Sequence, residues 1–257
     1  LVLVERRISD RRVLKLLRQW LAAGVMDEGQ WSATTGTPQG GVISPLLSNI
    51  YLHVLDRVWE DRCAHLGTLV RYADDFVVMC DTEAQVEGAR RRVGLVRTRL
   101  GLELHPEKTR TVDLSRGREG FDFLGCHLRK RMSGPVWERA RRRGYYLQRW
   151  PSQRAMTRVR ARVRALTARA RCHEDIRGVI ADVNPVLRGW GQYFRTGNAA
   201  TKFICIDTYV EERLRALLVR RAGSRLQAGR ADVWRRPFFE ALGLIRLRGT
   251  IQYPGAA

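Results

Sequence analysis

The sequence has few lysines, few acids and no long apolar run. All but four of its 47 basic residues are arginine, and 26 acidic residues leave a formal net charge of +21 over 257 residues. No apolar stretch has membrane-spanning length and no signal-peptide pattern is present, so we expect no membrane association. The five cysteines are odd in number and show no paired spacing. This is typical of reduced thiols in a cytosolic protein, and it argues against a disulfide framework or a zinc site.

The excess of arginine indicates a polyanionic partner. Guanidinium groups bind phosphate through two parallel hydrogen bonds and stack on nucleic-acid bases. A hydrophobic content of 44% is enough to build a core, and the length suits one large domain or two small ones. Nucleic acid is therefore the expected partner, although the base composition of a genome can also raise the arginine content.

An acidic pair lies at the centre of the most informative stretch, Leu69 to Met79. Apolar and β-branched residues flank Ala73-Asp74-Asp75 on both sides, which predicts a β-hairpin with the two acids at or near its turn. Adjacent carboxylates repel each other, and a bound cation relieves that repulsion. Mg²⁺ suits such oxygen ligands, which it combines with substrate phosphates. The alternative is a solvated Asp-Asp turn without a metal.

Helices are expected on both sides of this hairpin. Ser9–Ala23 has a helical apolar spacing, residues 36–41 are expected to form a loop, and a helix begins at Ser44-Pro45 with Ser44 as the N-cap. Thr82 and Gln85 fit a capping box for a helix that ends at Gly101. Residues 102–104 and 121–128 are expected to be short strands. This order predicts an α+β palm, an antiparallel sheet with helices on one face.

Four ordered blocks resemble the palm of reverse transcriptases, and most of all the group II intron-encoded branch. The blocks are Gly36-Thr37-Pro38-Gln39-Gly40-Gly41 with the following Ser44-Pro45-Leu46-Leu47 and Asn49, then Tyr72-Ala73-Asp74-Asp75, His105-Pro106-Glu107-Lys108-Thr109, and Phe121-Asp122-Phe123-Leu124-Gly125. The Tyr-Ala-Asp-Asp tetrapeptide alone is a weak signal. Four blocks in the family's order are a specific one.

The resemblance implies the chemistry of a template-directed polymerase that copies RNA into DNA. It implies that Asp74 and Asp75 are catalytic and bind Mg²⁺, with two ions in the site, and that Lys108 is a catalytic residue near the triphosphate. Phosphoryl transfer depends on positioning and on compensation of developing charge. Two metal ions about 3.5–4 Å apart activate the primer 3′ hydroxyl and stabilise the leaving pyrophosphate.

The resemblance also implies contacts to nucleotide, template and primer. Residues matched to the nucleotide and template site are Gln39, Gly40, Tyr72 and Ala73. Phe123-Leu124-Gly125 corresponds to the primer grip. The family supplies one more metal-binding Asp from a strand upstream of the Ser9 helix, and neither Glu5 nor Asp10 lies in that sequence context. We therefore expect this chain by itself to lack a metal ligand and most of the fingers.

After Leu128 the composition becomes strongly basic. Residues 129–171 hold fifteen basic residues and one acid, interleaved with aromatic residues. This pattern is typical of phosphate contacts combined with base stacking, and a solvated linker is the alternative. From Met156 the apolar residues keep a helical spacing and the arginines lie off that stripe. The predicted RNA-binding residues of this half are Arg141, Arg142, Arg143, Arg158, Arg162, Arg188 and Arg195.

The stretch Asn184–Arg195 resembles the maturase-specific thumb of intron-encoded reverse transcriptases, and the likeness extends from about Met156 to Arg221. Most of its aromatic residues, Trp190, Tyr193 and Phe194, are expected in the core. A further helix is expected over Asp207–Arg221. The basic tail from Trp234 to Tyr253 is expected to be a remnant DNA-binding segment. No Cys/His cluster of the nuclease type follows it, so no endonuclease domain is expected.

Together these patterns predict a palm over residues 1–128, a basic aromatic linker over 129–150, a mostly α-helical thumb over 151–225 and a basic tail over 226–257. The predicted function is an RNA-directed DNA polymerase of a group II intron with maturase activity, in a cytoplasmic bacterial ribonucleoprotein. Its partners would be intron RNA, an RNA template with a DNA primer, dNTPs and target DNA. The alternative is a maturase that stabilises intron RNA without polymerising. The sequence indicates no oligomeric state.

Overall fold

A computed structural model describes residues 1–22, 25–27, 30–32, 42–102, 105, 107, 109–132, 144–223 and 230–252. The loop expected over 36–41 lies outside these residues, as does the strand expected over 102–104 apart from its first residue. The chain divides into two compact units, Leu1–Thr111 and Val112–Ala257. Both units combine helices with small antiparallel sheets, so the expected α+β class is confirmed.

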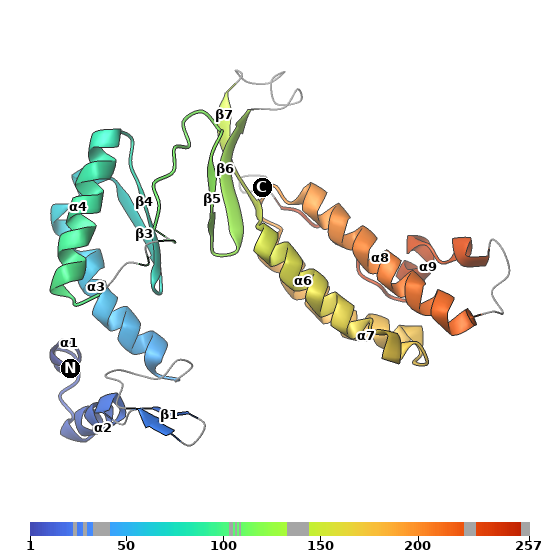
Figure 1. The fold of residues 1–257 in the computed structure, drawn as a ribbon, viewed down its shortest axis with the longest axis horizontal. Helices are drawn as coiled ribbons and strands as arrows, with labels where there is room; N and C mark the ends of the chain where they lie inside the picture. The colour runs from blue at the N-terminus through green and yellow to red at the C-terminus, as the bar shows by residue number, and fades with distance from the viewer. Residues whose placement is uncertain are drawn as a thin grey trace. The chain divides into compact units, whose positions relative to one another are not determined.

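The first unit is built around a β-hairpin and two long helices (Figure 1). Its helices are α1 (Val2–Glu5), α2 (Arg11–Ala22), α3 (Ser44–Arg62), the 3-10 helix η1 (Ala64–Leu66) and α4 (Glu83–Arg99). Its strands pair antiparallel, β1 (Val25–Asp27) with β2 (Gln30–Ser32) and β3 (Thr68–Tyr72) with β4 (Asp75–Met79). The predicted hairpin over Leu69–Met79 is therefore confirmed.

The core of this unit lies between α3, α4 and one face of the β3–β4 hairpin. Trp59 of α3, Cys63 directly after α3, and Ala89 and Val93 of α4 are buried. The hairpin residues packed on them are Leu69, Phe76 and Val78. The indole N–H of Trp59 donates to the Gly67 carbonyl at 2.8 Å. Gly67 has a φ of 134°, and a Cβ there would lie 2.2 Å from the Met79 carbonyl oxygen. Glycine is therefore required where the two ends of the hairpin meet.

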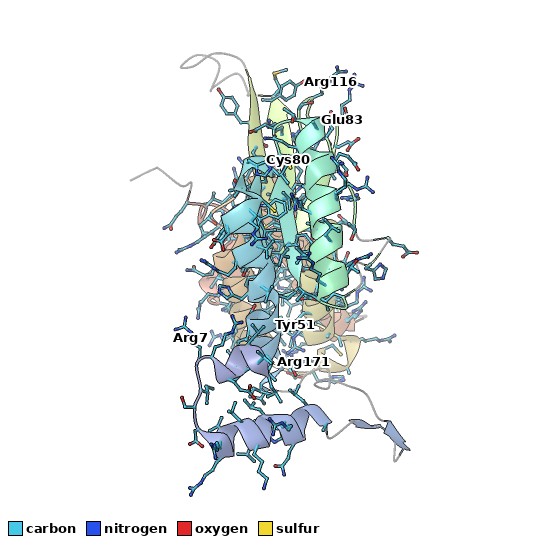
Figure 2. All side chains as sticks on the ribbon, turned by 90° about the vertical axis from the view of Figure 1, so that its left-hand side faces the viewer. Arg7, Tyr51, Cys80, Glu83, Arg116 and Arg171 are labelled. Carbon is cyan, nitrogen blue, oxygen red and sulfur yellow. The ribbon has the colours of Figure 1, made fainter. Side chains whose placement is uncertain are left out.

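Both ends of α4 are fixed by local contacts. Thr82 accepts a hydrogen bond from the Gln85 amide, and the Gln85 side chain accepts one from the Thr82 amide, which confirms the predicted capping box. Cys80 and Glu83 stand where β4 leads into α4, and Tyr51 lies on α3 (Figure 2). The Tyr51 hydroxyl donates to the Leu100 carbonyl at 2.5 Å, so the end of α4 is tied to α3.

The start of α3 differs from the prediction. Ser44 is the first helical residue, and Ile43 occupies the N-cap position without a capping side chain, so the assignment of Ser44 as N-cap is wrong by one residue. Pro45 lies in the first turn as expected, but proline fits more than one position there and does not define the first residue. The helix predicted over Ser9–Ala23 is present as α2, with Leu17 buried and Leu16 and Trp20 exposed.

The second unit joins a three-stranded sheet to a helical bundle (Figure 1). The sheet has the antiparallel order β5 (Gly120–Phe123), β6 (Cys126–Met132), β7 (Tyr145–Pro151). The helices are α6 (Gln153–Leu166), η2 (Arg169–Arg171), α7 (Ile176–Phe194), α8 (Ala200–Ala222), η4 (Arg230–Val233) and α9 (Arg236–Ala241). The described residues of the segment expected to be a linker, 129–150, are thus mostly paired in β6 and β7.

The single strand expected over Phe121–Leu128 is wrong, because the chain reverses at Leu124-Gly125. Phe123 pairs with Cys126, so these two residues alone form the turn between β5 and β6. Both have positive φ, 49° at Leu124 and 74° at Gly125. Positive φ at both central residues defines a type I′ turn, the geometry that matches the twist of paired strands.

One continuous core fills the helical part of the second unit. The predicted stripe of α6 is confirmed, with Met156, Val159 and Val163 buried, and Val210, Leu214 and Leu217 of α8 are buried opposite it. The segment from α9 to Leu247 belongs to the same core through Phe239, Leu244 and Leu247. No helix of the described residues combines the length and apolar character that crossing a membrane requires.

Two polar side chains, one buried and one half-buried, bind this last segment to the helices. Asp207 of α8, 5% exposed, accepts hydrogen bonds from the Arg236 guanidinium and from the amides of Leu247 and Arg248. Asn184 of α7 donates to the Gly243 carbonyl and accepts from the Ile245 amide. The basic stretch after Trp234 therefore packs as part of the thumb core over its described residues.

Candidate functional site

The acidic pair lies at the tip of the β3–β4 hairpin. Tyr72 and Asp75 are paired across the strands, so Ala73 and Asp74 form a two-residue turn and Asp75 begins β4. Asp74 and Asp75 are both exposed, and Tyr72 is 65% exposed on the hairpin face opposite the core. The tip therefore presents two carboxylates and an aromatic ring to solvent.

The turn holds a non-glycine residue in a strained conformation. Ala73 has a φ of 53°, whereas Asp74 has no positive φ, the pattern of a type II′ turn. Glycine normally occupies the first position of that turn, since a Cβ raises the energy of positive φ. Strain of this kind costs about 1–3 kcal/mol and persists where surrounding contacts enforce the conformation.

Arg71 provides those contacts from the core side of the hairpin. Its guanidinium donates to both carboxylate oxygens of Asp56 on α3, at 2.8 and 2.5 Å. It also donates to the Asn49 side-chain oxygen at 2.9 Å and to the Ala73 carbonyl at 2.7 Å. The hydrogen bonds from Arg71 hold the pKa of Asp56 below its usual range, and those to Asp56 raise the pKa of Arg71. Both groups are therefore charged at neutral pH.

The donor chemistry of the tip suits a hard divalent cation. Asp74 and Asp75 offer carboxylate oxygens, the ligands that Mg²⁺ takes together with phosphate oxygens and water. Within the part of the chain that the structure describes, no three acidic, histidine or cysteine side chains converge as a metal cluster. The pair fits a metal shared between protein and substrate phosphates.

A second strained turn carries the predicted primer grip. The Leu124 carbonyl accepts a hydrogen bond from the Tyr193 hydroxyl of α7 at 2.8 Å, and the Gly125 carbonyl accepts one from the Ser152 amide at 2.9 Å. Tyr193 was expected in the core but is 58% exposed. Its side chain lies on the face of α7 next to the β5–β6 turn, where the hydroxyl donates to the Leu124 carbonyl. The β5–β6 turn is thus anchored to the start of α6 and the end of α7.

A polar and aromatic cluster that the sequence reasoning missed lies on the sheet next to this turn. Asp122 and His127 are cross-strand partners, with 2.6 Å between a carboxylate oxygen and Nδ1. The His127 ring packs on Trp150 of β7 with 5.1 Å between centroids, and the Arg131 guanidinium lies 5.8 Å from the Trp150 ring centre. Only the strand register places these residues together, so no local pattern could have identified them.

The described arginines that are predicted to bind RNA lie on α6 and α7 or directly after α7. Arg158 and Arg162 of α6 and Arg188 of α7 are exposed, and Arg195 at the end of α7 is half-buried. Arg160 is different, because its guanidinium lies 5.8 Å from the centre of the Tyr209 ring. Arg158 and Arg162 of α6 are therefore available to a polyanion.

Two family models match the two halves of the chain. Residues 4–128 match the model described as reverse transcriptase (RNA-dependent DNA polymerase), and residues 156–234 match the group II intron, maturase-specific domain. The chain belongs to the group II intron reverse transcriptase/maturase family. The first match contains both the acidic turn and the primer-grip turn, and the second contains most of α6, including Arg158 and Arg162, and all of α7.

Curated relatives support this family assignment. Protein YkfC of Escherichia coli (strain K12) is 36% identical over 163 residues, which cover 51% of this chain and 42% of that protein. Group II intron-encoded protein LtrA of Lactococcus lactis subsp. cremoris is 26% identical, covering 52% of this chain and 32% of LtrA. An uncharacterized 91 kDa protein in a cob intron of Schizosaccharomyces pombe is 23% identical, covering 89% of this chain and 36% of that protein. The chain spans less than half the length of each of these relatives.

The structure brings together some of the residues predicted for this reverse transcriptase/maturase. Tyr72, Ala73, Asp74 and Asp75 share one turn, and Phe123-Leu124-Gly125 form the end of β5 and the next turn. Gln39, Gly40, Lys108, Arg141, Arg142 and Arg143 lie outside the described residues, so their roles stay predictions. Arg71 and Asp56 were not among the predicted site residues. One signal could have indicated Arg71. It lies two residues before Ala73, and residues at that spacing on a strand point to the same face of the hairpin.

Proposed function

We propose that this protein is an RNA-directed DNA polymerase of a group II intron that also binds its intron RNA as a maturase. The observation that carries the proposal is the Asp74–Asp75 pair, exposed at a strained hairpin tip inside a reverse-transcriptase match. A protein that only binds RNA gains nothing from two carboxylates facing a polyanion, because like charges repel.

The chain's own residues would position the reactants. Asp74 and Asp75 would hold Mg²⁺, which supplies a Lewis acid for phosphoryl transfer when bound. Tyr72 and Ala73 would lie against the nucleotide and template, and the carbonyls and backbone of Phe123-Leu124-Gly125 against the primer terminus. Catalysis of this type comes mostly from positioning. Rigid anchoring of both turns, by Arg71 in one unit and by Tyr193 and Ser152 in the other, supports that role.

The second unit would hold the RNA. Exposed arginines on α6 and α7 can contact phosphates, and Tyr146 has an exposed ring that would stack on unpaired bases. Partners would be the intron RNA, an RNA template with its DNA primer, and dNTPs, with DNA as the insertion target.

The deciding experiment is primer extension by the full-length gene product and its Asp74→Ala variant. On an RNA template with a DNA primer and Mg²⁺, we expect Asp74→Ala to abolish extension while intron RNA affinity stays at the wild-type value. Asp61→Ala, which removes an exposed acid of α3, is the matched control and should extend normally.

Two outcomes would contradict the proposal in different ways. Extension by Asp74→Ala at the wild-type rate would remove Asp74 from the metal site. Intron RNA binding without any extension by the wild-type protein would favour the maturase that stabilises RNA without polymerising.

A further inference from the structure

We propose that Arg71 is a positioning residue for the Asp74–Asp75 turn, and that Asn49 and Asp56 of α3 hold it in place. The inference rests on the proposed polymerase function and deepens it. It assigns a role to three side chains outside the acidic pair, one of which, Asn49, belongs to the first sequence block but had no role of its own.

The first support is the number of bonds that Arg71 makes. A guanidinium has five N–H donors in a rigid planar fork. Four of them are occupied, two by Asp56, one by Asn49 and one by the Ala73 carbonyl. The side chain is only 12% exposed. Arg71 is therefore already committed to protein acceptors and is not a free cation for a nucleic-acid phosphate.

The second support is the location of the bond to Ala73. Ala73 has a φ of 53°, so the turn is held in a conformation that alanine adopts at an energetic cost. The Ala73 carbonyl belongs to the peptide unit that leads into Asp74. A donor fixed on that carbonyl therefore restricts the peptide that sets the direction of the Asp74 side chain.

The third support is that α3 supplies the anchor. Asp56 and Asn49 lie two helical turns apart, a spacing that places both on one face of the helix. That helix is fixed to the core through Trp59 and through Cys63, the residue directly after its last turn. The bidentate Arg71–Asp56 pair therefore fixes the acidic turn to a packed helix, and such a pair is the strongest type of charge-assisted contact.

The test compares Arg71→Lys with a matched control. Lysine keeps the charge but lacks the fork, so it cannot reach Asp56, Asn49 and Ala73 together. Arg57→Lys changes an arginine of α3 that is 57% exposed and makes only surface pairs. Each full-length variant is assayed for melting temperature, for amide hydrogen exchange at residues 72–76, and for primer extension.

In Arg71→Lys we expect faster exchange at residues 72–76 than in wild type. We also expect a kcat about 10- to 100-fold lower, with the KM for primer–template unchanged. Arg57→Lys should match wild type in all three measurements. A role limited to stability would lower the melting temperature and leave the kcat of the folded fraction unchanged.

If Arg71→Lys does not fold, Asn49→Ala gives the answer, because Asn49 is exposed and its removal takes away one anchor only. It should accelerate exchange at the turn and lower kcat by a smaller factor. Unchanged exchange at residues 72–76 or a wild-type kcat in the folded variant would overturn the inference. If wild-type protein does not extend primers, the polymerase proposal fails and the exchange result alone decides the role of Arg71.

Discussion

Arg71 and Asp56 form an ion pair unlike the others on α3. Their side chains are 12% and 23% exposed, whereas those of Arg57, Glu60 and Asp61 are 54–67% exposed. Surface pairs contribute about 0–1 kcal/mol, because water screens them and two long side chains lose freedom. The half-buried, bidentate Arg71–Asp56 pair contributes more to stability than a surface pair. Removing one partner leaves the charge of the other without compensation.

The stability of the first unit should therefore depend on pH through Asp56. The pKa of this carboxyl is lower in the folded protein than in the unfolded chain, so its contribution is present above the usual carboxyl pKa and is lost as pH falls toward the folded value. Asp56→Asn should lower the free energy of unfolding by about 1–3 kcal/mol at pH 7. The difference from wild type should shrink below about pH 4. Urea unfolding from pH 7 to pH 3 measures this, with Asp61→Asn as control, and a constant difference across that range would contradict it.

Single residues differ in how well the sequence reveals them. Asp74 and Asp75 were predicted at a hairpin tip because β-branched runs on both sides leave few other structures for them. Arg71 was not, since one arginine among so many carries no signal and its partners lie 15 and 22 residues away on α3. The tertiary fold creates that site.

The two hairpin turns differ in how clearly the sequence indicates them. The β3–β4 turn was predicted. The β5–β6 turn was not, because its residues Leu124-Gly125 are not one of the Asn-Gly or Asp-Gly pairs that are typical of type I′ turns. Helices were predicted better. Their apolar spacing is periodic, and capping residues such as Thr82 act locally.

Gly125→Val tests the β5–β6 turn. Space is not the constraint, because a Cβ at Gly125 would meet only Phe194 Cζ at 3.8 Å. The φ of 74° is the constraint, and it should cost at least about 1–2 kcal/mol of stability. The displaced carbonyls should raise the KM for primer–template without changing the Mg²⁺ dependence of extension.

Gly178→Ala is the control for this change. Gly178 lies in the first turn of α7, and an alanine methyl group there would meet no heavy atom within 4 Å apart from its chain neighbours and the backbone of the helix itself. The substitution should leave primer dependence unchanged and raise stability by about 0.5–1 kcal/mol. Wild-type primer dependence in Gly125→Val would assign the turn a purely structural role.

At the scale of the whole molecule, the net charge of +21 means that the affinity for RNA should depend strongly on salt concentration. Phosphate contacts release counterions, so each contact adds to the slope of log affinity against log salt. Charge on a face that binds no RNA leaves that slope unchanged. The arginines of α6 can therefore be separated from general surface charge.

Arg158→Glu/Arg162→Glu reverses two exposed arginines one helical turn apart on α6. If both contact intron RNA, affinity should weaken and the slope should fall by about 1.4, the value for two single-stranded contacts. Thermal melting should be unchanged, since Met156, Val159 and Val163 stay buried. Arg91→Glu/Arg92→Glu on α4 changes the net charge equally and should alter the slope less. Equal slopes in both double variants would assign the α6 charge to a solvated face.

The division of the chain was harder to predict than its elements. Composition suggested a separate basic tail, yet Phe239, Leu244 and Leu247 complete the core that α6, α7 and α8 begin. Asp207 meets its partners 29, 40 and 41 residues later in the sequence. Contacts between residues so far apart in the sequence produce no periodic pattern of residue types, so local patterns could not predict them.

The contacts of Asp207 also set the order of events during translation. The ribosome completes α8, with its carboxylate, well before Arg236, Leu247 and Arg248 emerge from the exit tunnel. Until then the nascent thumb holds an acid without its cation and an open space where Phe239 belongs. The first unit can fold while synthesis continues, since domains form from the N-terminus onward. The helical core of the second unit can therefore close only after Arg248 has emerged, so we expect it to form after the core of the first unit.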